Sequence, residues 1–220
     1  MLANNPFIAI TSSGKEKVVD RVKERVELQL YINDALKDGK LIIIKGNPGA
    51  GKSTILNTLL RDLQKTKNIE IIKEEFTPSI YNKLRSISFN PAHKFIIIMD
   101  DFNNIELFDK TSQIKLIELM DELAKKACVI LVENRDEGVE NDFKRLGKRF
   151  DKYELGGLQR SDLKQLIMDR LNSVRTVPRD NLDPFTEEEY DKIFKKSGGN
   201  PRIALLICSA LFDQKESNII

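Results

Sequence analysis

Eight consecutive residues, from Gly46 to Ser53, combine the residue types that bind phosphate groups. They read "GNPGAGKS" and fit the pattern G-x-x-x-x-G-K-[ST] throughout, directly after the apolar run "LIIIK". Glycines let backbone N–H groups converge on phosphate oxygens, and a following helix points its positive end at the same anion. The pattern therefore predicts a bound nucleoside triphosphate, with ATP as the expected ligand. The residues expected to contact it are Gly46, Asn47, Pro48, Gly49, Ala50, Gly51, Lys52, Ser53 and Thr54.

A magnesium ion is expected beside this loop. Lys52 has the charge and length to reach the β- and γ-phosphates, and the Ser53 hydroxyl is a typical Mg²⁺ ligand in such loops. The apolar run "FIIIM" ends in two aspartates, and Asp100 is expected to hold the metal, mainly through water. The predicted metal residues are therefore Ser53 and Asp100.

Asp101 is the candidate that activates the attacking water, where many ATPases with this loop carry a glutamate. Because aspartate is one methylene shorter, slow hydrolysis is expected. Two alternatives remain open. Asp101 starts a turn and has no chemistry, or Glu74 or Glu75, near the end of the preceding strand, supplies the base.

The elements that must position these residues follow from the apolar periodicity. Short apolar runs predict strands, and segments with helical spacing alternate with them, which favours a parallel three-layer α/β sheet. The expected strands are 41–45, 69–76, 94–102 and 128–134, and the expected helices are 16–37, 53–65, 79–87 and 113–127.

Beyond residue 157 the pattern changes to helices without intervening strands. They are expected at 161–171, 186–198 and 201–211, with Ser161 and Thr186 as N-caps. We expect two domains: an α/β core of residues 1–156, including the N-terminal arm, and a small helical lid of residues 157–220.

The composition sets limits on other functions. Lys and Arg number 36 and Asp and Glu 34, a balance that neither demands nor excludes nucleic acid. Cys128 and Cys208 stand in apolar runs and are expected to be buried. With a single histidine, His93, no Cys/His metal site is expected. No apolar run is long enough for a membrane span and no signal peptide is recognisable, so a cytoplasmic protein is expected.

Four segments together resemble the AAA+ ATPases. The loop "GNPGAGKST", the strand "VILVEN", the stretch "KRLGKRF" and the segment "SGGNPRIAL" look like that family's phosphate loop, sensor 1, inter-subunit arginine stretch and sensor 2. The resemblance implies that Asn134 hydrogen-bonds the γ-phosphate or the lytic water, and that Arg202 contacts the γ-phosphate from the lid. It also implies that Arg149, or alternatively Arg145, reaches the nucleotide of a neighbouring subunit.

Each of these residues also has a structural interpretation. Asn134 is then the cap of a strand end, and Arg202 is a surface residue of an amphipathic helix. Arg149 then belongs to a solvated basic cluster with Lys144, Arg145, Lys148 and Lys152.

Within the AAA+ ATPases, "GGNPR" and the helix before the loop look closest to the initiator and helicase-loader branch, which includes the archaeal Orc1/Cdc6-like proteins. In those proteins a winged-helix domain follows the lid, and none is expected after the last helix here. The resemblance implies an ATPase that forms homo-oligomers with ATP. It also implies action on DNA or a DNA-bound protein in replication initiation, helicase loading or transposition.

Two alternatives belong to other functional classes. The first is a monomeric switch of the STAND type, which holds its nucleotide and rarely hydrolyses it; the Asp100–Asp101 pair is compatible with it. The second is a small-molecule kinase, whose loop can have the same pattern. The three helices after residue 157 fit a kinase poorly.

Overall fold

The structure is a computed structural model, and it describes residues 5–8, 21–66, 68–74, 76–134 and 139–217. Residues 16–20 of the expected first helix, and Glu75, lie outside the described residues. Two compact units are present. The α/β unit comprises residues 22–48 and 52–155, and the helical unit comprises residues 1–21, 49–51 and 156–220. Each is described by itself.

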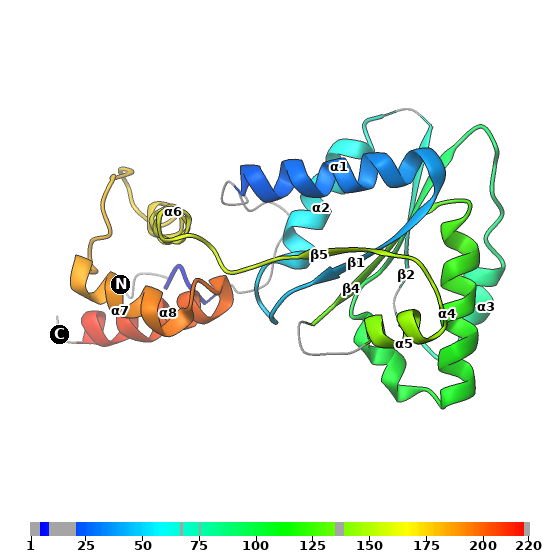
Figure 1. Cartoon of the computed structure of the whole chain (residues 1–220). Coiled ribbons are helices and arrows are strands. Elements are labelled where there is room, and N and C mark those ends of the chain that lie inside the picture. The colour runs from blue at the N-terminus through cyan, green and yellow to red at the C-terminus, as the bar shows by residue number, and fades with distance from the viewer. Residues whose placement is uncertain (1–4, 9–20, 67, 75, 135–138, 218–220) are drawn as a thin grey trace. The chain divides into compact units, whose positions relative to one another are not determined.

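A parallel sheet forms the centre of the α/β unit (Figure 1), which confirms the expected fold class. Its order is β2-β3-β4-β1-β5, so β1 lies between β4 and β5. Because all strands are parallel, their carboxyl ends meet at one edge, where ligands bind in sheets of this kind. The strands are β1 (Lys40–Lys45), β2 (Ile69–Glu74), β3 (Lys94–Met99), β4 (Cys128–Glu133) and β5 (Asp151–Glu154).

Helices cover both faces of this sheet. Alternate residues of β1 point to opposite faces: Ile42 and Ile44 enter the core beneath α1 and α2, whereas Leu41 and Ile43 enter the core beneath α4. Burial on both faces explains why β1, β3 and β4 read as continuous apolar runs. The helices are α1 (Val22–Asp38), α2 (Lys52–Leu63), α3 (Ile80–Arg85), the 3₁₀ turn η1 (Phe102–Leu107), α4 (Lys110–Ala124) and α5 (Val139–Arg145).

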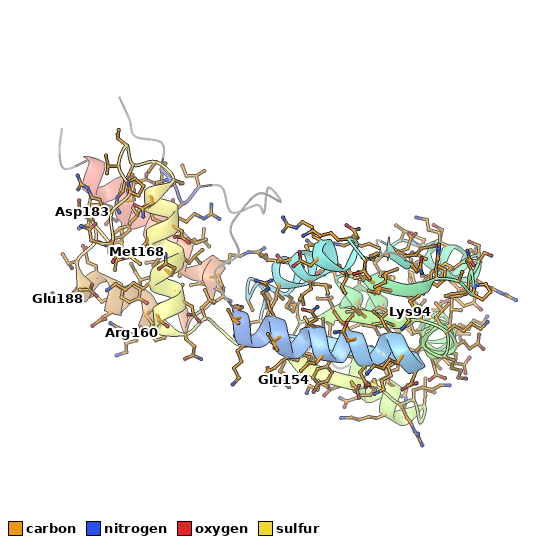
Figure 2. The ribbon with its side chains drawn as sticks, turned by 90° about the horizontal axis from the view of Figure 1, so that it is seen from above. Lys94, Glu154, Arg160, Met168, Asp183 and Glu188 are labelled. Carbon is orange, nitrogen blue, oxygen red and sulfur yellow. The ribbon has the colours of Figure 1, made fainter. Side chains whose placement is uncertain are left out.

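The helical unit contains α6 (Arg160–Asn172), α7 (Glu187–Ser197) and α8 (Pro201–Ser217). Figure 2 shows Arg160 at the start of α6, where its guanidinium pairs with Asp191 and lies 5.0 Å from the ring centroid of Tyr190. Thr186 caps α7 in a reciprocal capping box with Glu189, as expected. The expectation for Ser161 is wrong, because the N-cap of α6 is Gln159, which makes no side-chain cap bond.

The N-terminal residues depart from the expected grouping with the α/β core. Phe7 is fully buried in the helical unit, with its ring centroid 5.8 Å from that of Phe185. The Asn5 amide donates to the Ser209 carbonyl (3.2 Å) and to the Asp213 carboxylate (2.8 Å). The apolar ring and these hydrogen bonds attach residues 5–8 to α8. Among the described residues, no helix has the length and apolarity needed to cross a membrane.

Candidate nucleotide-binding site

The predicted phosphate loop connects the carboxyl end of β1 to the first turn of α2, which begins at Lys52. Gly49 and Gly51 have φ of +80° and +96°, a region that residues with a Cβ rarely adopt. A Cβ on Gly46 would lie 2.6 Å from the Leu155 carbonyl oxygen, so this position excludes a side chain. Gly46, Gly49 and Gly51 therefore occupy backbone positions that disfavour a side chain, as expected for a phosphate loop.

The Lys52 side chain folds back over this loop. Its ammonium donates to the carbonyl of Gly46 (2.6 Å), to the carbonyl of Asn47 (3.4 Å) and to the side-chain oxygen of Asn134 (3.2 Å). These three acceptors are uncharged, whereas a phosphate would offer anionic oxygens and stronger charge-assisted bonds. The residues present fit a nucleoside triphosphate, because a phosphate oxygen would form a stronger bond with this ammonium than these carbonyl and amide oxygens do.

Asn134 directly follows β4, the neighbour of β1 in the sheet. In the parallel register Lys45 lies opposite Glu133, which places the residues after both strands at the same edge. The structure thereby brings together Lys52 and Asn134, which are 82 residues apart in the sequence. The role of Asn134 at a γ-phosphate stays a prediction.

Asp100 follows β3 at the same edge and has a partner that sequence reasoning missed. The Lys73 ammonium, from β2, lies 3.6 Å from the Asp100 carboxylate, and the two side chains are 45% and 24% exposed. Lys73 precedes the last residue of β2, and β2 is parallel to β3. The signal available in the sequence was a lysine near the end of one strand and an aspartate just after the next. The pairing of these two strands was needed to connect them.

No three His, Cys, Asp or Glu side chains converge as a metal site anywhere in the described part of the chain. Mg²⁺ commonly takes one or two protein oxygens and completes its octahedron with phosphate oxygens and water. The Ser53 hydroxyl and the Asp100 carboxylate are donors of this type. This set of donors fits the predicted metal only when a nucleotide phosphate is present with it.

Asp101 adopts the left-handed conformation, with φ of 50° and ψ of 44°. It precedes η1, but its carboxylate makes no cap bond, and its backbone N–H donates to Asp100 Oδ1 (3.1 Å). Its side chain is exposed. Aspartate tolerates this conformation better than most residues, and such outliers often occur at functional sites. The conformation is compatible with both the predicted catalytic role and the alternative of a turn.

The basic side chains from the end of α5 to β5, within residues 144–152, are paired with one exception among the described residues. Four of them have acidic partners: Lys144 with Glu140 (4.0 Å), Arg145 with Asp142 (3.1 Å), Lys148 with Asp121 (3.0 Å) and Lys152 with Glu140 (3.2 Å). Arg149 is exposed and pairs with no other described residue. Of the two arginines predicted to act in trans, Arg149 therefore has the free guanidinium, while Arg145 is engaged within its own helix.

In the helical unit, Arg202 lies in the first turn of α8 and is exposed. Asn200 caps this helix by accepting from the Ile203 N–H (3.2 Å), and Pro201 takes the first helical position. Within the same unit, a Cβ built on Gly49 would lie 2.5 Å from the Cβ of Arg202. The role of Arg202 at a phosphate stays a prediction.

Arg21 is a further residue that sequence reasoning missed. It belongs to the helical unit and is nearly fully buried. Its guanidinium donates to the carbonyls of Ala50 (2.9 Å) and Gly156 (3.0 Å). These two hydrogen bonds tie a carbonyl of the phosphate loop to the carbonyl of Gly156 through one buried guanidinium. No motif in the sequence signals this contact.

Both cysteines are buried and free, and burial raises the pKa of each thiol to about 12. A buried thiol of this pKa is almost wholly protonated at neutral pH and is a poor nucleophile. The expectation that Cys128 and Cys208 have packing roles agrees with their burial.

The chain is similar to known proteins both in sequence and in fold. Residues 31–171 of the 220 match the family described as Novel STAND NTPase 3 (nSTAND3). No curated protein matches the chain by sequence.

Among solved structures, the Aeropyrum pernix ORC1 protein in complex with DNA is similar, with a TM-score of 0.66 and 12% sequence identity. The similarity covers 96% of this chain and 64% of that chain, so this chain spans less than two-thirds of the ORC1 protein. At this identity the likeness shows a shared fold alone.

The family match agrees with the predicted P-loop NTPase and with the STAND-type alternative, and the match to ORC1 is one of fold. The nSTAND3 match takes in all five strands, β1 to β5, together with the phosphate loop, Asp100 and Asn134. This protein belongs to the Novel STAND NTPase 3 family.

Proposed function

We propose that the protein is an ATP-dependent switch that binds Mg²⁺·ATP in the loop 46–54, retains it, and hydrolyses it slowly. The observation that carries the proposal is the position of the Lys52 ammonium, held between the Gly46 carbonyl and Asn134 Oδ1. A phosphate that enters the loop replaces these uncharged acceptors with anionic oxygens. Lys52 and Asn134 then report the presence of the γ-phosphate to the ends of β1 and β4.

The other predicted residues have distinct parts in this function. The Ser53 hydroxyl and the Asp100 carboxylate would hold Mg²⁺, which neutralises charge on the β- and γ-phosphates. The Asp101 carboxylate accepts a proton from the attacking water, and Asn134 orients that water or the γ-phosphate. Arg202 stabilises the charge that spreads over the γ-phosphoryl oxygens in the transition state.

Slow turnover follows from the short reach and exposure of Asp101. A single-turnover assay tests this, with the chain in excess over labelled ATP and Mg²⁺. Most of the label is expected to remain protein-bound ATP for minutes, with release of ADP and phosphate on that timescale or slower. Hydrolysis of the bound ATP and release of ADP and phosphate within seconds would contradict the switch.

A second candidate function is favoured by Arg149. Its guanidinium has no partner among the residues that the structure describes, while its basic neighbours are paired. We propose that ATP can assemble copies of the chain so that Arg149 of one completes the site of the next, and that the assembly acts on a DNA-linked partner. The Orc1–DNA complex among similar folds motivates the DNA arm of this test. Light scattering with a non-hydrolysable ATP analogue, with and without duplex DNA, measures the expected growth in mass. A strict monomer in every condition would leave the monomeric switch.

Phosphate transfer to a small molecule remains the weakest alternative. The family match is to NTPases and lends it no support. Labelled ATP incubated with a mixture of nucleosides and nucleoside monophosphates tests it directly. Labelled product other than inorganic phosphate would revive the kinase.

A further inference from the structure

A buried ion pair lies directly behind the candidate site. The Lys45 ammonium is 3.5 Å from the Glu133 carboxylate, and the two side chains are 5% and 1% exposed. Lys45 ends β1 immediately before Gly46, and Glu133 ends β4 immediately before Asn134. The two residues are opposite each other in the parallel register. The pair thus connects the two strand ends from which the phosphate loop and Asn134 emerge.

Further charges extend this pair toward α5 and β5. Glu140 of α5 lies 3.8 Å from the same Lys45 ammonium and 3.2 Å from the Lys152 ammonium of β5. Lys152 also pairs with Glu154 (2.6 Å), which Figure 2 labels in the α/β unit. These contacts raise the pKa of Lys152, because two carboxylates stabilise its charged form. The ends of β1, β4 and β5 and the first turn of α5 are therefore held by one group of alternating charges.

Such a pair is a poor device for stability alone. Removing two charges from water costs free energy that their attraction only partly returns, and apolar side chains of similar volume often stabilise a fold as well or better. Buried charged pairs are best attested where they fix the register or arrangement of elements. Lys45 is one residue before the phosphate loop, and Glu133 is one residue before Asn134. The arrangement that this pair fixes is therefore that of the loop and Asn134.

Two links between the same strand ends lie side by side. The outer link is the Lys52 ammonium, which bridges the Gly46 carbonyl and Asn134 Oδ1. The inner link is the Lys45–Glu133 pair. A nucleotide that draws the Lys52 ammonium onto its phosphates breaks the outer link and leaves the inner one unchanged.

We propose that Lys45 and Glu133 are positioning residues for γ-phosphate recognition: their buried ion pair holds Asn134 beside the phosphate loop after Lys52 has moved to the nucleotide. This inference rests on the proposed function, because it assumes that ATP occupies the loop. It predicts that loss of the pair weakens ATP binding more than ADP binding, because only ATP carries the phosphate that Asn134 recognises.

The test compares ATP and ADP affinity, both with Mg²⁺, by calorimetry in the full chain. A hydrogen bond to a charged group corresponds to about a tenfold change in affinity. Asn134→Ala should therefore lower the preference for ATP over ADP about tenfold. Glu133→Gln should lower the preference for ATP over ADP toward the preference of Asn134→Ala. Its ADP affinity should stay within about twofold of that of the native chain. If Glu133 acts through Asn134, the Glu133→Gln/Asn134→Ala variant should have the same preference for ATP over ADP as Asn134→Ala alone.

Two further variants separate positioning from stability. Glu154→Gln makes the same chemical change at the neighbouring strand end and should leave the ATP preference unchanged. Lys45→Met with Glu133→Gln removes the whole pair, so no buried ammonium loses its partner. This double variant should recover thermal stability relative to Glu133→Gln while its ATP preference stays low.

The outcomes distinguish this inference from the proposed function. If Glu133→Gln lowers ATP and ADP affinity equally, or if the ATP preference returns with stability in the Lys45→Met/Glu133→Gln variant, the pair is structural and the inference is overturned. Full additivity of Glu133→Gln and Asn134→Ala would also overturn it. If the native chain binds neither nucleotide, the proposed function itself fails.

Discussion

The Lys73 ammonium lies 3.6 Å from the Asp100 carboxylate, so a side chain of β2 places a positive charge beside the residue predicted to hold magnesium. Both side chains are partly exposed, so their attraction is screened by water. A cation this close competes with a metal ion for the same carboxylate oxygens. If Asp100 holds Mg²⁺ as proposed, the pair links the magnesium dependence of nucleotide binding to a residue outside the loop.

Replacing Lys73 by Met should lower the Mg²⁺ concentration needed for ATP binding. An exposed pair contributes roughly 1 kcal/mol or less, so the midpoint should fall about fivefold or less. A fluorescent ATP analogue titrated with Mg²⁺ measures this midpoint. Lys83→Met is a matched control, because Lys83 forms a similarly exposed pair with Glu74 at 3.5 Å on the same edge strand. An unchanged midpoint in Lys73→Met, or an equal shift in the control, would show that Lys73 does not guard the metal position.

If Arg149 acts in trans, Arg149→Ala should preserve ATP binding and reduce hydrolysis, by about 10³-fold for a full arginine-finger role. Mixing provides a sharper measurement. Chains with Arg149→Ala have an intact loop, and chains with Lys52→Met have an intact arginine, so the mixture should hydrolyse ATP faster than either variant alone. Arg145→Ala serves as the control and should keep most activity, because Arg145 is engaged with Asp142. A mixture no more active than its components would argue against a shared site.

The two thiols should resist modification in the folded protein. With a pKa of about 12 for each, roughly one thiol in 10⁴ is ionised at pH 8. A thiol reagent at pH 8 should find almost no reactive cysteine in the native chain and two per chain in denaturant. Because the thiolate is the reactive form, any residual native rate should rise with pH throughout this range. Fast labelling of the native chain near neutral pH would contradict the burial of Cys128 and Cys208.

Thr186 and Ser161 test where helices α7 and α6 have their N-caps. Thr186 accepts from the Glu189 N–H (3.2 Å), so Thr186→Ala should lower the unfolding free energy by about 1 kcal/mol. Ser161 lies inside the first turn of α6 and not at its cap, so Ser161→Ala should change it by about 0.5 kcal/mol or less. Denaturant unfolding of both variants provides the comparison. Equal losses would mean that α6 begins at Ser161 in solution.

The sequence predicted those elements whose identity depends on local pattern. Three strands are buried on both faces and read as continuous apolar runs, and the loop that follows the first has glycines at positions with positive φ. The capping box at Thr186 was equally local. Asp100 was found because it directly follows such a strand, and Asn134 because "VILVEN" resembles the sensor 1 strand of the AAA+ ATPases. The parallel sheet brings these two strand ends to one edge.

The elements that the sequence did not predict depend on contacts far along the chain. Strand β5 reads "DKYE", and only Tyr153 is buried, so its pairing with β1 has no apolar signature. Helix α5 is short and mostly charged, and it is held by Val139 and Phe143 in the core beneath α4. Lys73, Arg21 and the Lys45–Glu133 pair escaped notice for the same reason. Each acquires its role from a partner whose proximity only the fold establishes.

Calorimetric titration of Mg²⁺·ATP into the native chain and into Lys52→Met tests the central claim most directly. The native chain should bind one ATP, and loss of the Lys52 ammonium should weaken binding about 100-fold or more, because it removes charge-assisted bonds to two phosphates. Lys65→Met, which removes an exposed lysine paired with Asp62 just beyond α2, should bind as the native chain does. Absence of ATP binding by the native chain, or equal binding by Lys52→Met, would contradict the assignment of this loop as the nucleotide site.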